Sequence, residues 1–460
     1  MPFGFGAKFC VEWARVSLWE FFSDIKVENK ENADIEQPVI FAVTHHNMLL
    51  DPAVICNAYS DQYLHYWAKS SIFTGEYATR FLESTGCVPV DRNNADDRQN
   101  LYKATMDVLK LNESLVIFPE GTSHSLPRLS KLKDGASFNK IINSVNKVSL
   151  EYASSLSSFP KNADGSFPVK AAIVPVGIVY TEKSKYRSVV IVRFGEPIQP
   201  DNFLEEYQQN PKSAAKRLTS EIEKSLLAMT INSDDWESRH SATMARNILF
   251  PGEQGRMPDF IEVTQSLINV FAERESLPIV KNLCLYRESL EELSLRDSDL
   301  IRNKKLVPVT TQFIIRDFII KTFACVANLP FSLPILVAHI PLYLIGSYYG
   351  KHELYEEVRA QDKILYCTLV LPFVYFLMFL WIWYYLYCFR FFGFFYAIIT
   401  MVILVWLHVV TIDENYENFK QLRGTAQLFD SFVLGRGVRL RQTRAQLACN
   451  SERILTRSWI

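Results

Sequence analysis

Two histidines stand side by side in the stretch VTHHNMLLDP, and an aspartate follows closely. These residues are His45, His46 and Asp51. Histidine is the usual general base near neutral pH, and an aspartate on its other ring nitrogen fixes the tautomer and stabilises the imidazolium. Such a pair can activate a hydroxyl of the substrate. A turn at LLDP could bring Asp51 under either ring, or Asp51 could only cap the helix that Pro52 begins.

Other polar residues stand at the ends of apolar runs. VIFPEGTSHS places Glu120 and Gly121 after one such run, and STGCVPVDR ends another on Arg92. Gly121 allows close approach of a substrate to the backbone, and an arginine suits bidentate contact with phosphate. A fourth stretch, IVPVGIVY, is strand-like.

The elements that position these residues alternate along the chain. Short β-branched and apolar runs predict strands at 38–44, 115–121, 170–181 and 188–198. Helical patterns lie between or after them, at 95–112 and 213–231. This alternation predicts an α/β fold with a mostly parallel sheet flanked by helices, and the ends of such strands commonly carry ligand chemistry.

In order and spacing, these stretches resemble the four motifs of the glycerolipid (PlsC-like, H-x4-D) acyltransferase superfamily. HNMLLD resembles its first block, GCVPVDR its second, FPEGTS its third and VPVGI its fourth, while LKDGA resembles a lysine-glycine element after the third. These enzymes transfer a fatty acyl group from an acyl thioester to a hydroxyl of glycerol 3-phosphate or a lysophospholipid. The resemblance implies a PlsC-like acyltransferase domain.

The resemblance also implies roles for individual residues. His46 becomes the general base, with Asp51 orienting it. The substrate-binding residues implied are Arg92, Glu120, Gly121, Thr122, Ser123, His124 and Lys133. The third block of the family often has an arginine where this chain has Ser123, so phosphate binding is expected to fall more heavily on Arg92 and Lys133, with His124 or Arg128 as further candidates. No metal or redox cofactor is expected, and acyl-CoA is the expected co-substrate.

A narrower resemblance links the chain to eukaryotic, mainly fungal, membrane-bound glycerol-3-phosphate/dihydroxyacetone-phosphate acyltransferases. It rests on FPEGTSH, LCLYRESLEELSLRD and the hydrophobic C-terminal part. That branch tends to carry its histidine one residue earlier, which makes His45 the alternative base. The implied activity is sn-glycerol-3-phosphate 1-O-acyltransferase, with dihydroxyacetone phosphate as a further acceptor. The alternative is a 1-acylglycerol-3-phosphate or other lysophospholipid acyltransferase.

Composition divides the chain into a globular and a membrane part. The expected segments are an N-terminal amphipathic helix (1–30), the acyltransferase domain (31–231), a linker and helical segment (232–320), a membrane region (321–412) and a basic cytosolic tail (413–460). The net charge of −1 gives no polyelectrolyte character, so a nucleic-acid partner is not expected. Eight cysteines without a C-x-x-C pair predict single thiols in a reducing compartment.

Within the membrane region, 364–389 and 391–412 are each long enough to cross a bilayer and predict a hairpin. Three prolines interrupt 321–349, which is expected to be re-entrant. Basic residues flank the region on both sides, which places both flanks in the cytosol. Together with the resemblance, this predicts a multi-pass protein of the endoplasmic reticulum membrane whose site faces the cytosol.

Two other classes of function fit the sequence less well. A metal-dependent phosphohydrolase would use His45, His46, Asp51 and His65, but the sequence shows no clear second acidic cluster. A membrane scaffold or transporter is disfavoured because the apolar runs contain no acidic residue for a transport path.

Overall fold

The structure is a computed structural model. It describes residues 5–60, 62–90, 104–105, 107–130, 132, 171–251, 257–273, 277–302, 305–307, 310–353, 355–433 and 435–458. The chain forms two compact units. The first comprises Met1–Ile231 and Glu353–Gln361, and the second Asn232–His352 and Asp362–Ile460.

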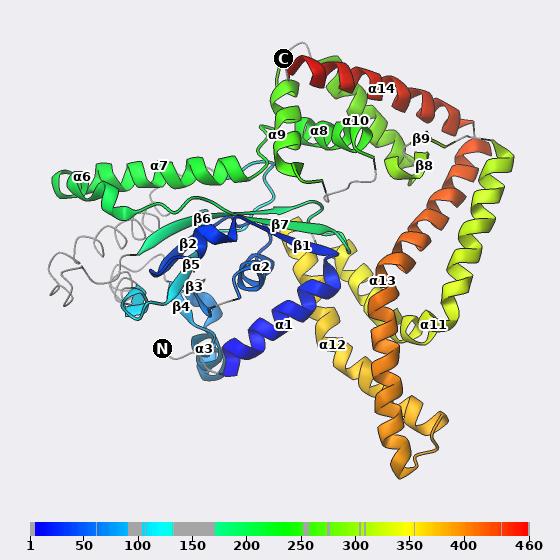
Figure 1. Cartoon of the computed structure of the whole chain (residues 1–460), viewed down its shortest axis with the longest axis horizontal. Helices are drawn as coiled ribbons and strands as arrows, with labels where there is room; N and C mark the ends of the chain where they lie inside the picture. Colours follow the sequence, from blue (N-terminus) through cyan, green and yellow to red (C-terminus); the bar gives the residue numbers. More distant parts are fainter. Residues whose placement is uncertain are drawn as a thin grey trace. The chain divides into compact units, whose positions relative to one another are not determined.

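The first unit is built on a seven-stranded sheet (Figure 1). Its strands are β1 (Asp24–Glu28), β2 (Val39–Val43), β3 (Leu64–Lys69), β4 (Cys87–Val90), β5 (Ser114–Ile117), β6 (Ala172–Tyr180) and β7 (Val189–Phe194). The order is β1-β7-β6-β2-β5-β3-β4, and β6 with β7 is the antiparallel pair among otherwise parallel neighbours. The prediction of a mostly parallel sheet is confirmed.

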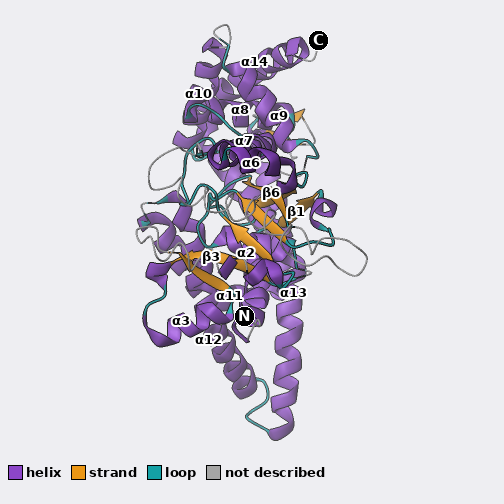
Figure 2. Cartoon of the chain, turned by 90° about the vertical axis from the view of Figure 1, so that its left-hand side faces the viewer, coloured by secondary structure: helices purple, strands orange, loops and turns teal. Residues whose placement is uncertain are grey.

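Helices cover both faces of this sheet (Figure 2). They are α1 (Phe5–Phe21), α2 (Leu50–Ala58), α3 (Gly75–Ser84), α6 (Leu204–Gln209) and α7 (Pro211–Met229). Successive side chains of β2 point to opposite faces of the sheet. Ile40 packs in the cluster that contains Leu218 of α7. The ring of Phe41 contacts that of Tyr59, the residue just after α2. Every residue of β2 is buried, which explains its continuous apolar run.

The sheet begins earlier than the sequence indicated. The segment 1–30 was expected to be a helix, but α1 ends at Phe21 and β1 pairs with β7 from Asp24 onward. The β-branched residues of β1, Ile25 and Val27, alternate with charged ones, as in an edge strand.

The second unit contains α8 (Trp236–Leu249), α9 (Phe260–Phe271), α10 (Leu277–Glu292), the short strands β8 (Ile301–Arg302) and β9 (Lys305–Leu306), and α14 (Arg436–Ser458). Residues 413–460 were expected to form a basic tail, but they continue a helix and then form α14. Leu440 and Leu447 of α14 are buried, and Arg444 binds Asp297 through two nitrogens at 2.7 and 3.0 Å. The basic residues from Arg436 onward therefore belong to a packed helix.

Three long helices complete the second unit: α11 (Thr311–His352), most of α12 (Glu356–Tyr385) and α13 (Phe391–Val433). Among the described residues, Val358–Tyr385 and Phe391–Ser431 are long and apolar enough to cross a membrane, by length and composition. The Pro-containing segment is not broken, because α11 runs through it as one helix. α11 packs along α13. A neighbouring helix of this kind can help to satisfy the backbone groups that a proline leaves without a hydrogen bond.

Candidate active site

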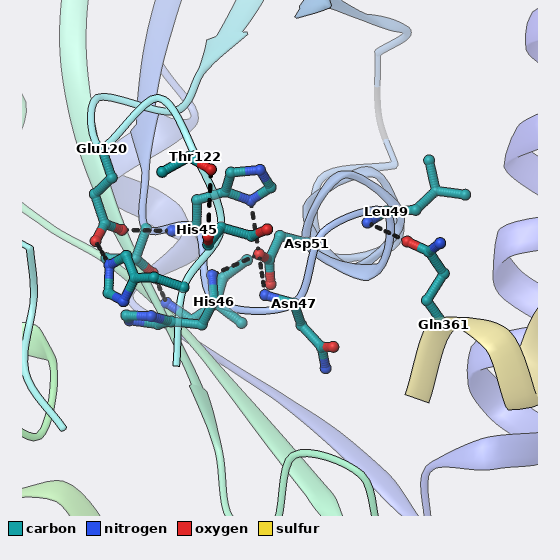
Figure 3. Close-up of polar contacts among 12 residues, drawn as sticks. His45, His46, Asn47, Leu49, Asp51, Glu120, Thr122 and Gln361 are labelled. Carbon is teal, nitrogen blue, oxygen red and sulfur yellow. Dashed lines mark hydrogen bonds and ion pairs between the residues drawn. The ribbon is translucent and has the colours of Figure 1, made fainter. Parts of the chain in front are cut away.

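His45, and not His46, places its ring on Asp51 (Figure 3). The two residues lie on either side of the turn between β2 and α2, and Nδ1 of His45 is 2.9 Å from Oδ2 of Asp51. The backbone N–H groups of His46 and Asn47 donate to the same oxygen at 2.8 and 2.7 Å. Met48 has a left-handed backbone, with φ of 35°, where the turn reverses. The turn thus brings two amides and one imidazole onto a single carboxylate oxygen.

Asp51 is fully buried, and its other oxygen also has a partner. The hydroxyl of Tyr180, the last residue of β6, donates to Oδ1 at 2.7 Å. Burial first, and then the charge of Asp51, raises the pKa of Tyr180 well above its ordinary value, so the hydroxyl stays protonated. The N-cap residue of α2 is Leu49, which makes no side-chain capping bond, and Asp51 is the second residue of the helix. Its role is to hold the turn and the ring of His45.

Glu120 supports the same turn from the neighbouring strand. It follows β5, which lies parallel to β2, and its Oε1 accepts the backbone N–H of His45 at 2.6 Å. Its Oε2 accepts the N–H of Ser130 at 3.1 Å and contacts Nε2 of His124. Gly121 follows with φ of 66°, a conformation that favours glycine. The carboxylate of Glu120 therefore ties the two loops together.

The rings of the two histidines face different neighbours. His45 stacks on Phe118 with ring centroids 4.3 Å apart. His46 meets the ring of His124 edge-on at 5.1 Å. Together with Glu120, these last two histidines each offer a ligand atom within 4.8 Å of the others, which is a set that could hold a metal ion.

The structure brings most of the predicted site residues to one sheet edge. Glu120, Gly121, Thr122, Ser123 and His124 share the loop after β5. Arg92 and Lys133 lie outside the described residues. His65 belongs to a different place, because its ring contacts Glu113 at 2.8 Å and the carbonyl of Gly86 at 3.1 Å. The four-residue set suggested for a phosphohydrolase is therefore not assembled.

Sequence reasoning missed Tyr180 as a site residue. The signal was available, because Tyr180 ends the fourth motif stretch, IVPVGIVY, on a strand whose neighbour is β2. A phenol at the end of that strand reaches the turn that carries Asp51.

The arrangement can carry out general-base chemistry. With Nδ1 held by Asp51, the ring of His45 keeps Nε2 for a proton from a substrate hydroxyl. The side chain of His45 is 17% exposed, whereas that of Asp51 is fully buried. The ring of His45 is thus open to solvent, whereas the carboxylate of Asp51 is shielded from water.

Comparison with known proteins supports this chemistry. Residues 24–179 match the acyltransferase family model. The chain is 23% identical over 273 residues to glycerol-3-phosphate O-acyltransferase 2 of Saccharomyces cerevisiae, a match over 57% of this chain and 34% of the relative. It is 27% identical over 124 residues to the chloroplastic 1-acyl-sn-glycerol-3-phosphate acyltransferase LPAT1 of Arabidopsis thaliana, over 27% of this chain and 34% of the relative. The chain thus covers about a third of the length of these curated relatives.

Among solved structures, the acyltransferase PlsC from Thermotoga maritima aligns with 47% of this chain and 79% of its own. The TM-score is 0.31 and the identity 18%. The family match, by contrast, covers the turn of His45 and Asp51, the loop of Glu120 and six of the seven strands completely or nearly so. Residues 24–179 of this chain therefore form a domain of the acyltransferase family.

Proposed function

We propose that this protein transfers a fatty acyl group from acyl-CoA to the sn-1 hydroxyl of glycerol 3-phosphate, giving lysophosphatidic acid. The contact of 2.9 Å between His45 and Asp51, inside a domain of the acyltransferase family, is the observation that carries the proposal. A yeast relative named for this activity supports the choice of acceptor.

In this mechanism Nε2 of His45 takes the proton of the acceptor hydroxyl while Asp51 holds Nδ1. The oxygen attacks the thioester carbonyl and forms a tetrahedral oxyanion. The carbon–sulfur bond then breaks, and the CoA thiolate takes the proton from His45. The ester and free CoA are the products. We assign the base to His45 because its ring, and not that of His46, lies on the carboxylate.

Substrate recognition is proposed for the loop after β5 and for two cationic residues. Glu120, Gly121, Thr122 and Ser123 are placed at the sheet edge beside the base. His124 is engaged at both ring nitrogens, by Glu120 and by the N–H of Leu126. We therefore propose that Arg92 and Lys133 carry most of the phosphate binding, and that His124 takes little part in it.

The long apolar helices support a membrane location. Val358–Tyr385 and Phe391–Ser431 have the length and composition of membrane spans, and both the acyl chain and the proposed product are lipids. We propose a multi-pass protein of the endoplasmic reticulum membrane with its site in the cytosol. The protein should stay in the pellet after extraction of membranes with alkaline carbonate, and release into the supernatant would reject this proposal.

A second acceptor class has its own support. A plant relative is named as a 1-acyl-sn-glycerol-3-phosphate acyltransferase, which would make lysophosphatidate the acceptor. The purified full chain, supplied with acyl-CoA and equal concentrations of glycerol 3-phosphate, dihydroxyacetone phosphate or lysophosphatidate, decides between them. The proposal expects the highest kcat/KM with glycerol 3-phosphate. A clear preference for lysophosphatidate would replace it with the second acceptor, and no transfer to any of the three would reject both.

A further inference from the structure

Three metal-capable side chains lie together beside the His45–Asp51 pair. His46 comes from the loop after β2, and Glu120 and His124 come from the loop after β5. One ligand atom of each lies within 4.8 Å of the others. Because β2 and β5 are parallel neighbours, both loops leave the same edge of the sheet. The cluster is thus formed by the fold and not by chance contact between distant surfaces.

We propose that His46, Glu120 and His124 bind a first-row transition-metal dication, of which Zn²⁺ is the representative. Two imidazoles and one carboxylate suit Zn²⁺, Fe²⁺ or Co²⁺, whereas Mg²⁺ and Ca²⁺ prefer oxygen ligands. Three protein ligands leave one position of a tetrahedral ion open to water or to another oxygen. The inference revises the expectation from the sequence that the site uses no metal.

The dimensions of the cluster fit such an ion. Two ligands on one tetrahedral zinc ion lie about 3.4 Å apart, given Zn–N and Zn–O bonds of about 2.0–2.2 Å. One ligand atom of each of the three residues lies within 4.8 Å of the others, so binding of an ion would require the side chains to rotate until this spacing is reached. The side chain of Glu120 is fully buried and that of His124 is 12% exposed, so few water molecules compete for the ligands.

The carboxylate is already held in place for this role. Oε1 of Glu120 accepts the N–H of His45 at 2.6 Å, and Oε2, which also accepts the N–H of Ser130 at 3.1 Å, lies on the side of His124. Hydrogen bonds of this kind orient the ligands of metal sites. The ion would replace the direct contact between Oε2 of Glu120 and Nε2 of His124. If His124 binds through Nε2, its ring proton moves to Nδ1 and the contact of 3.2 Å from the N–H of Leu126 is lost.

Metal content of the full-length protein tests this site without an activity assay. The purified chain, with any affinity tag removed, is stripped with a chelator, dialysed and titrated with Zn²⁺ by calorimetry, and bound zinc is measured by mass spectrometry. We expect one Zn²⁺ per chain. His46→Gln and His124→Gln should each weaken binding at least about tenfold. Binding should also raise the Tm of the wild-type protein, and less so that of the variants.

His240→Gln is the matched control, because it removes a histidine on α8, in the other unit, and should leave Zn²⁺ affinity unchanged. Substitution with Co²⁺ gives a second readout, since a four-coordinate site has a distinct visible spectrum that both cluster variants should alter. Absence of stoichiometric Zn²⁺ binding, or equal affinity in wild type and both folded variants, would overturn the proposal. Neither result depends on acyl transfer, so failure of the proposed function is recognised separately.

Discussion

The hydroxyl of Tyr180 lies 2.7 Å from Oδ1 of Asp51, the oxygen that His45 does not use. The ring of His45 is therefore positioned by two strands, because β2 leads into the turn that carries His45 and β6 supplies the phenol that holds Asp51. Oδ2 of Asp51 contacts the ring of His45 and accepts the N–H groups of His46 and Asn47, whereas Oδ1 accepts the hydroxyl of Tyr180.

Tyr180→Phe should lower kcat about tenfold with little change in KM. The variant removes one buried hydrogen bond, which contributes about 1–1.5 kcal/mol and orients Asp51 and not the substrate. Tyr59→Phe is the control, because it also removes a buried phenol hydroxyl, one that donates to the carbonyl of Ala33 at 3.3 Å. Steady-state kinetics should show the loss only in the first variant, and equal losses would contradict a specific role of Tyr180.

Glu120→Ala should destabilise the protein by about 2–4 kcal/mol, because the N–H groups of His45 and Ser130 each lose their acceptor. Glu120→Gln keeps an acceptor oxygen for one of them and should cost less. Denaturant unfolding of both variants gives the two free energies. Equal stability of Glu120→Ala and wild type would show that the carboxylate does not tie the loops together.

Arg444→Ala should cost about 3–5 kcal/mol, since it leaves Asp297 buried without its cation. Arg436→Ala offers a control on the same helix, because its pair with Glu292 is exposed and should contribute about 0–1 kcal/mol. Thermal unfolding in detergent compares them. A similar small loss of stability in both variants would contradict the packing of α14 through Arg444.

Cys56 and Cys87 should react with iodoacetamide more slowly than Cys449 at neutral pH. Burial raises the pKa of both thiols, so less reactive thiolate is present at a given pH, whereas Cys449 is exposed. Mass spectrometry of the native protein at increasing pH should show labelling of these two half-buried residues only at a more alkaline pH. Labelling of all three at equal rates would contradict the burial.

Much of the fold followed from local patterns in the sequence. The continuous apolar run before His45 predicts a strand buried on both faces, and β2 is one. Strands that alternate with helices predict a parallel sheet, whose common edge then brings Asp51 near Glu120. The two apolar helices were also readable from length and composition.

Which of the two adjacent histidines contacts Asp51 could not be predicted from local patterns in the sequence. It depends on the path of one turn, in which Met48 adopts a left-handed backbone and the N–H of His46 points at Asp51. Spacing selected His46, and only the neighbouring branch of the resemblance offered His45. The packing of α14 could not be predicted from local sequence either. It depends on the contact between Arg444 and Asp297, which are 147 residues apart in the sequence.

The account is tested most directly by the acyl-transfer rates of His45→Ala and His46→Ala in the purified full chain, with glycerol 3-phosphate and acyl-CoA at saturation. Loss of the general base should lower kcat by about 10²–10⁴-fold in His45→Ala. His46→Ala should lose much less, because its ring does not lie on Asp51. The reverse order, with His46→Ala inactive and His45→Ala close to wild type, would contradict the assignment of His45 as the base.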